Sequence, residues 1–240
     1  GLTVFEGVKP EKFDVEVIDV LKNFRPRQEL ILVKTKHPRL EVAKVVAGMS
    51  GSPIYIDGKM IGAYAYGWTF GKEPVAGVTP IRNMLDELER PLPKSIDGWP
   101  IQVLPRAQAD KTRDKHAARG SSQNRFAGNV GANDLSEHAK QLAKRQQKSV
   151  GQNGTAIPVA TPLLIGGMTS GAVELAKELL SPLGLEPLQA GGGGEVEKDA
   201  PTKYVDGGAI GVELIRGDMS AQGLGTVTRV EGDKLVAFGH

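Results

Sequence analysis

The dipeptide Asp57-Gly58 is the feature that most constrains the fold of this 240-residue chain. It lies between two β-rich runs, at residues 54–56 and 60–66. A two-residue hairpin turn requires positive backbone φ angles, which aspartate and glycine adopt more easily than most residues. The sequence therefore predicts a tight antiparallel hairpin, and with it a sheet within residues 1–90.

Other segments extend this β pattern. Alternating apolar and polar residues predict a half-buried strand at 13–18, and short apolar runs predict strands at 30–33 and 75–78. Apolar residues at helical spacing predict a helix at 81–88. Near the other end, strands are predicted at 210–215, 225–230 and 235–238, with a hairpin turn at 231–233. A mainly β fold follows.

The middle of the chain has a different composition. Residues 101–150 contain ten basic and four acidic residues and few β-formers, which is typical of an exposed insertion. A capping-box pattern predicts a helix at 134–143, and a second helix is predicted at 171–180. We therefore divide the chain into a β unit at 1–95, a partly flexible insertion at 96–205, and the start of a second β unit at 206–240.

Composition excludes several classes of function. The 30 lysines and arginines nearly balance 28 aspartates and glutamates, and no aromatic platform accompanies the basic insertion, so no nucleic-acid partner is expected. The chain has no cysteine, which rules out disulfides and a cysteine nucleophile. No apolar run reaches the roughly 18 residues of a membrane span. The four histidines lack metal-ligand spacing, so we predict neither a metal site nor a cofactor.

The segment Gly48-Met49-Ser50-Gly51-Ser52-Pro53 carries the chemical signal. A nucleophilic serine must stand on a tight turn with backbone N–H groups near the developing oxyanion, and flanking glycines permit such a backbone. The segment resembles the Gly-Asp-Ser-Gly-Gly-Pro turn of chymotrypsin-like serine proteases. That resemblance implies that Ser50 is the nucleophile and that the amides of Gly48 and Ser50 form the oxyanion hole. An ordinary loop is the alternative.

Longer stretches resemble the SpoIVB peptidases, the stage IV B sporulation serine proteases. The shared stretches are residues 11–17, 38–40, 46–54 and 57–63, and the segment 223–240 is similar to the part of that family that carries the catalytic histidine. The resemblance implies a chymotrypsin-like architecture of two β-barrels with a helix-containing insertion between them. It also implies that His240 is the general base.

Two features depart from the family pattern. The serine block precedes the histidine block here, and the third triad residue, an aspartate in the family, falls on His37. Asp14, Glu16 and Glu41 are possible substitutes. An altered triad, a Ser-His dyad and an inactive enzyme therefore remain open, because triads are defined by geometry and not by chain order.

The strand residues Tyr64, Tyr66 and Gly67 are candidates for substrate binding. In a chymotrypsin-like fold the edge of this strand pairs with the substrate backbone. Ordinary packing within the sheet is the alternative.

These observations predict a serine endopeptidase that acts on proteins or peptides and processes itself. The family resemblance alone implies a periplasmic or extracellular location. The alternatives are a catalytically inactive, protease-like module that binds peptides and, as a weaker one, a serine hydrolase of small esters.

Overall fold

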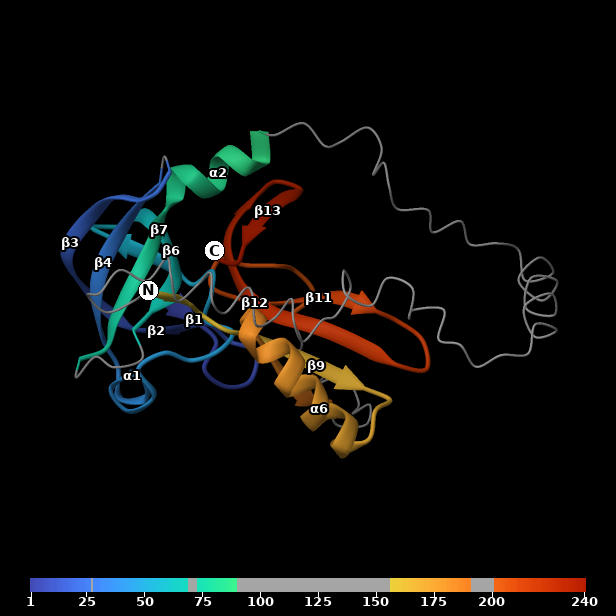
Figure 1. Cartoon of the computed structure of the whole chain (residues 1–240). Coiled ribbons are helices and arrows are strands. Elements are labelled where there is room, and N and C mark those ends of the chain that lie inside the picture. The colour runs from blue at the N-terminus through green and yellow to red at the C-terminus, as the bar shows by residue number, and fades with distance from the viewer. Residues whose placement is uncertain (27, 69–72, 90–155, 191–200) are drawn as a thin grey trace, which may run out of the picture. The chain divides into compact units, whose positions relative to one another are not determined.

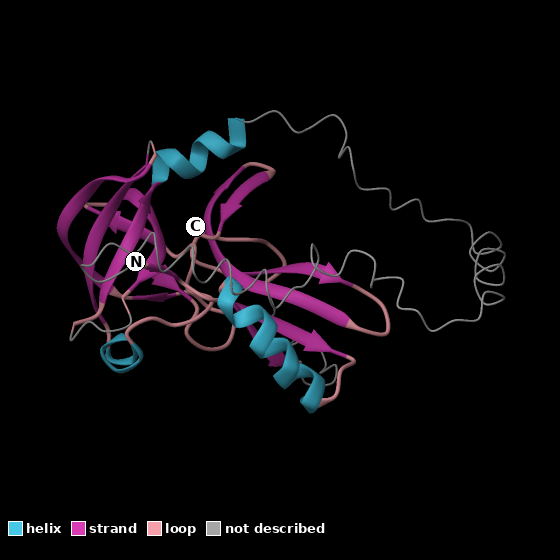
Figure 2. Cartoon of the chain, in the orientation of Figure 1, coloured by secondary structure: helices cyan, strands magenta, loops and turns pink. Residues whose placement is uncertain are grey.

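The computed structural model describes residues 1–26, 28–68, 73–89, 156–190 and 201–240. These residues lie in one compact unit, which comprises Gly1–Glu89 and Ser136–His240. Two principal sheets dominate the described part of the chain (Figures 1 and 2). The predicted mainly β fold is therefore confirmed, and it is consistent with a chymotrypsin-like protein. The two-barrel detail stays a prediction.

The first sheet is antiparallel throughout. Its strand order is β3 (Asp14–Arg25), β4 (Gln28–Lys36), β7 (Val75–Pro80), β6 (Lys59–Gly67) and β5 (Pro53–Ile56), and β8 (Ile157–Pro158) pairs with β6. The predicted hairpin joins β5 to β6, with φ angles of 49° at Asp57 and 76° at Gly58. The strand predicted at 13–18 is present as β3, which continues to Arg25. This strand forms one edge of the sheet.

Apolar side chains of this sheet form the main core. Val33, Tyr64 and Val78 come from β4, β6 and β7, and each is fully buried. Phe13 packs edge-on against the Tyr64 ring, with the ring centroids 6.4 Å apart. Full burial of one such side chain stabilises the fold by about 1.5–3 kcal/mol. This packing makes the sheet a firm support for the loops at its ends.

The second sheet is mixed. Its order is β10 (Leu185–Gln189), β9 (Thr161–Gly166), β12 (Ser220–Glu231) and β11 (Ala209–Ile215), and β13 (Lys234–Ala237) pairs with β12. β9 and β10 are parallel, so the chain needs a crossover between them. The crossover is α6 (Ser170–Leu180) followed by the 3₁₀ turn η1 (Ser181–Leu183). Thr169 caps α6 by accepting a hydrogen bond from the Ala172 amide.

The structure bears on several predicted elements. It confirms the helix predicted at 171–180, and the helix predicted at 81–88 is present as α2 (Ile81–Glu89). The helix predicted at 134–143 lies outside the described residues. The boundary predicted at residue 205 separates β10 from β11, two strands of the same sheet. Two short pieces complete the fold: the helix α1 (Pro38–Ala43) and the pair β1 (Leu2–Thr3) and β2 (Glu11–Lys12).

The two principal sheets meet at the segment that precedes β5. The amide of Thr226 on β12 donates to the carbonyl of Ser50 at 2.9 Å, although 176 positions separate these residues in the sequence. The C-terminal residues then pass beside β6 and β7, where Figure 1 places the label C. Among the described residues, no helix is long and apolar enough to cross a membrane.

Candidate active site

The segment from Gly48 to Ser52 forms a tight turn before β5. Gly48 and Gly51 have φ angles of 90° and 98°, in the region that favours glycine. A Cβ atom on Gly51 would collide with the carbonyl oxygen of Thr226 and lie 2.6 Å from the Phe238 amide nitrogen. Gly51 therefore provides both the backbone conformation and the space that this turn needs.

The hydroxyl of Ser52 closes this turn. It donates to the Met49 carbonyl at 2.7 Å, and the Ser52 amide donates to the same oxygen at 2.9 Å. Ser52 was the competing candidate for the nucleophile, and this contact gives its side chain a structural function. Ser50 is thus the serine of the turn whose hydroxyl is turned toward the C-terminal residues.

Two threonines of β12 hold the turn on either side of Ser50. Thr226 donates its side-chain hydroxyl to the Gly48 carbonyl at 3.0 Å, and Thr228 donates to the Gly51 carbonyl at 2.7 Å. Both threonines are buried. Residues two apart on a strand point to the same face, so one strand can bind both ends of the turn. We call Thr226 and Thr228 the threonine clamp.

The Ser50 hydroxyl lies beside the last residue of the chain. Its Oγ is 2.8 Å from Nδ1 of His240 and also accepts a hydrogen bond from the Gly239 amide at 2.9 Å. When Nδ1 carries no proton, the hydroxyl donates to it, and Nε2 is then the protonated ring nitrogen. That arrangement lets the imidazole take the serine proton. Ser50 is fully buried beneath these residues.

The backbone of Gly239 fixes the position of His240. Its carbonyl accepts a hydrogen bond from the Thr79 hydroxyl on β7 at 2.5 Å. A Cβ atom on Gly239 would clash with the Tyr64 carbonyl, so glycine allows the chain to lie directly against β6. Thr79 and Gly239 together bring the imidazole to the serine.

Two effects lower the pKa of the His240 imidazole below its usual value. Burial of the ring is the larger, and the positive charge of Arg25 is the second. His240 as a whole residue is exposed, whereas its ring lies near Tyr66, with a centroid separation of 6.3 Å. The imidazole is therefore neutral, and able to accept a proton, at a lower pH than an ordinary histidine.

None of the candidate replacements for the third triad residue contacts His240. Glu16 forms an ion pair with Lys36 at 2.9 Å, and Glu41 is exposed in the first turn of α1. His37 caps α1 and stacks on Phe5. Among the described residues, Ser50 is the only hydrogen-bond partner of the His240 ring, so no carboxylate in this part of the chain orients the imidazole.

Comparison with known proteins gives one match. Residues 2–85 fit the model of the family described as SpoIVB peptidase S55. Over these residues the chain is similar to the SpoIVB-type serine peptidases. The match covers about a third of the 240 residues and contains the serine turn, but it ends well before the segment that carries His240. Neither the curated proteins nor the solved structures give a match.

A serine peptidase needs N–H donors near its serine, and the two predicted donors differ. The Gly48 amide donates to the Ala160 carbonyl at 3.0 Å and is therefore occupied in this conformation. The Ser50 amide has no acceptor among the described residues. The oxyanion hole of Gly48 and Ser50 stays a prediction, and Gly48 can contribute only if its bond to Ala160 opens.

The predicted substrate-binding strand does not have the free edge that this prediction assumed. Gly67 pairs with Ala76 of β7 on one side and with Ile157 of β8 on the other. Tyr64 is fully buried, and burial raises the pKa of its hydroxyl well above the usual value. Tyr66 is also buried, but it lines the cavity next to His240. Of the three candidates, Tyr66 lines this cavity, and substrate binding by Tyr64, Tyr66 and Gly67 stays a prediction.

The sequence analysis missed several residues of this candidate site. These are Arg25, Thr79, Thr226, Thr228 and Gly239. The threonine clamp has a recognisable signal, because two threonines at a spacing of two lie on one face of a strand. Arg25 and Thr79 have no such signal, because each reaches the site only through an interaction with C-terminal residues that are distant in the sequence.

Proposed function

We propose that this chain is a serine endopeptidase in which Ser50 is the nucleophile and His240 is the general base. The observation that carries the proposal is the 2.8 Å separation between Ser50 Oγ and His240 Nδ1. It lies within hydrogen-bond reach, as a nucleophile and its base require. The family match over residues 2–85 supports the general class, a serine peptidase.

In this mechanism, Ser50 Oγ attacks the carbonyl carbon of the scissile peptide while its proton passes to His240 Nδ1. The tetrahedral intermediate carries its negative charge on the former carbonyl oxygen, which the Ser50 amide is free to bind. The imidazolium then gives its proton to the leaving amine, and an acyl-enzyme remains. Water, deprotonated by the neutral imidazole, releases the acid product and restores Ser50.

A fluorophosphonate probe tests the nucleophile directly. We expect the wild-type chain to be labelled and both Ser50→Ala and His240→Ala to lose labelling, because the probe reacts with an activated serine. In related triads, loss of such a residue lowers kcat by a factor on the order of 10⁶. Ser52→Ala is the matched control and should still be labelled. Labelling that persists in folded Ser50→Ala would refute the assignment.

Self-processing is a further part of the proposal. We expect purified wild-type protein to accumulate internal cleavage products that mass spectrometry detects, and Ser50→Ala to remain intact. The predicted site, the basic region at 101–130, lies outside the described residues. Identical fragments from both proteins would assign the cleavage to another protease. The proposed periplasmic or extracellular location rests on family resemblance, and fractionation of cells that make the protein would test it.

A peptide-binding module without catalytic activity is the second candidate. It is favoured by one observation: no carboxylate among the described residues pairs with the His240 ring. Loss of the acid in a complete triad lowers kcat by about 10⁴. A chain that binds peptides with the same affinity before and after Ser50→Ala, and that no probe labels, would support this candidate over the peptidase.

A further inference from the structure

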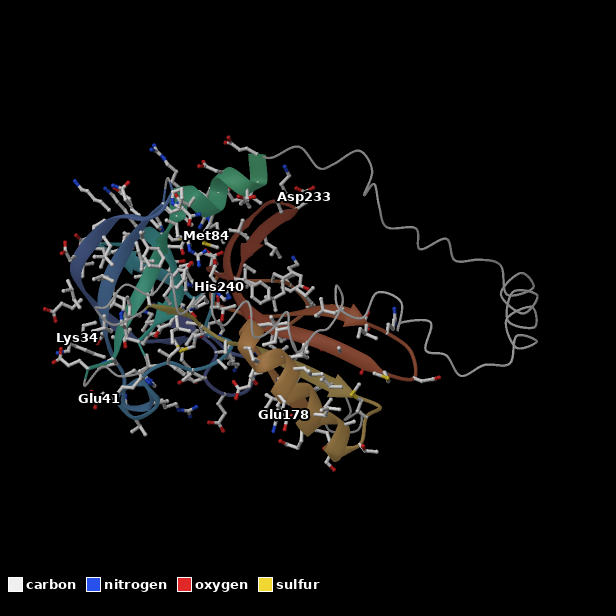
Figure 3. The ribbon with its side chains drawn as sticks, in the orientation of Figure 1. Lys34, Glu41, Met84, Glu178, Asp233 and His240 are labelled. Atoms are coloured by element: carbon white, nitrogen blue, oxygen red, sulfur yellow. The ribbon has the colours of Figure 1, made fainter. Side chains whose placement is uncertain are left out.

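A cavity of about 480 Å³ lies next to the His240 ring. Its wall is formed by the β3–β4 turn region, Tyr66 of β6, Thr79 of β7, α2, and the C-terminal residues from β13 onward. Met84 of α2 and His240, both labelled in Figure 3, line it. The cavity thus lies beside the proposed base, and Ser50 is not among the residues that line it.

Arg25 gives this cavity a cationic wall. Its guanidinium lies over the rings of Phe24 and Tyr66, 5.8 Å and 5.3 Å from their centroids. No carboxylate within the described ranges forms an ion pair with it. Stacking on aromatic rings holds a guanidinium in place and leaves its N–H groups free to bind a carboxylate through two parallel hydrogen bonds.

The imidazole on the same wall lacks a negative partner. Ser50 occupies Nδ1, and Nε2 has no partner among the described residues. Arg25 also makes a protonated ring less stable, because two positive charges repel each other. A carboxylate that neutralises Arg25 and lies near the ring would stabilise the protonated imidazole and raise its pKa.

The remaining polar groups of the wall restrict where such a carboxylate can bind. Gln28 and Asn83 can donate hydrogen bonds to it, whereas Glu87 on α2 carries a negative charge of its own. A carboxylate is therefore favoured at the Arg25 side of the cavity and disfavoured next to Glu87.

We propose that this cavity binds a carboxylate group of the peptide substrate against Arg25, and that the bound carboxylate supplies the negative charge that His240 lacks within the described chain. The inference rests on the proposed function, because it assigns the substrate class of that site. The carboxylate comes from an acidic side chain or from the free C-terminus of the peptide. Both present the same group to the guanidinium.

Binding can be measured apart from catalysis in the Ser50→Ala background. The probes are fluorescein-labelled, alanine-rich peptide amides with one glutamate moved through each position, their glutamine matches, and an all-alanine peptide with a free or amidated C-terminus. We expect at least one carboxylate peptide to bind about tenfold or more tightly than its neutral match. Adding Arg25→Gln should remove this difference.

Arg82→Gln is the matched control. It removes one arginine charge from α2, and Arg82 does not line the cavity. This variant should keep the preference for the carboxylate peptide. Equal affinities for charged and neutral peptides at every position, or equal losses in both arginine variants, would overturn the inference. The arms with glutamate and with a free C-terminus identify the source of the carboxylate.

The second test follows the pH dependence of kcat in the wild-type enzyme. A bound carboxylate raises the pKa of the imidazole, so the acid limb of kcat should lie at higher pH for the carboxylate peptide than for its neutral match. Coinciding limbs would overturn the proposed effect on His240. Failure of the proposed function is distinguishable from either result, because it would appear as wild-type protein that fluorophosphonate does not label.

Discussion

The serine turn and the C-terminal residues that carry His240 are held in very different ways. The turn has its own internal bonds through Ser52, accepts two hydroxyl hydrogen bonds from the threonine clamp, and receives the Thr226 amide at Ser50. The Gly239 peptide makes two hydrogen bonds, one to Thr79 and one to Ser50 itself. The nucleophile is thus fixed from several sides, whereas the base depends on few contacts.

This difference indicates where the site is sensitive. When one contact of the turn is lost, the remaining contacts still hold the turn in place. The loss should therefore lower the free energy of unfolding more than it moves Ser50. A lost contact at the C-terminal residues should shift the imidazole, and a displacement of about 1 Å can lower a rate by about 10². Four predictions test this contrast, beginning with the largest expected effect.

Gly51→Ala should abolish activity and destabilise the fold severely. The added methyl group meets the Thr226 carbonyl and the Phe238 backbone, and the φ angle of 98° adds strain. Gly58→Ala is the control, since it also has a positive φ angle of 76° but nothing within 4 Å of the new atom. The control should cost only about 1–2 kcal/mol. Urea denaturation compares them, and similar losses would contradict the close packing of the turn.

Thr79→Val should lower kcat by about 10- to 100-fold with little change in KM, because it frees the Gly239 peptide. Thr79→Ser retains the hydroxyl and should restore most of the rate. Thr35→Val is the matched control: Thr35 is a buried threonine that also donates to a backbone carbonyl, that of Pro74 at 3.1 Å. If both valine variants lose stability alike and both retain kcat, Thr79 does not position His240.

Thr228→Val should mainly affect stability. It leaves the buried Gly51 carbonyl without its side-chain donor, at a cost of about 1–3 kcal/mol in the free energy of unfolding. Because the other contacts of the turn remain, kcat should fall less than in Thr79→Val. Denaturation and peptide hydrolysis of the same preparations check this order, and a larger kcat loss in Thr228→Val would reverse the comparison.

The smallest expected effect concerns pH. Burial and Arg25 lower the pKa of His240, so the acid limb of kcat/KM should lie below pH 6.5, the usual histidine value. Arg25→Gln removes one positive charge and should move that limb upward, without reaching pH 6.5, because burial is the larger cause. A wild-type limb at or above pH 6.5 would contradict this description of the ring.

Local patterns predicted the elements that local physics determines. Asp57-Gly58 specified the β5–β6 hairpin because its backbone needs residues that tolerate positive φ. Helical spacing specified α2, and a capping residue before the segment and Pro182 after it indicated α6. The glycines around Ser50 marked a turn that the structure also contains. The C-terminal similarity singled out His240, which lies next to Ser50 in the structure.

Contacts between distant segments could not be predicted in the same way. The strand β6 was expected to have a free edge, but β8, about 90 positions later in the chain, pairs with it at Tyr66 and Gly67. The bond from Thr79 to Gly239 spans 160 positions. A short stretch of sequence does not encode such a long-range contact, because the contact depends on how the two sheets pack together.

The pairing of Ser50 with His240 across 190 positions also has a consequence in time. Ribosomes make proteins from the N-terminus, so a growing chain displays the hydroxyl long before the ring nitrogen has been synthesised. With the proposed roles, a nascent polypeptide cannot cut its neighbours until translation has passed the codon for His240. The order of the two blocks thereby delays proteolysis until the sheets that support it have been made.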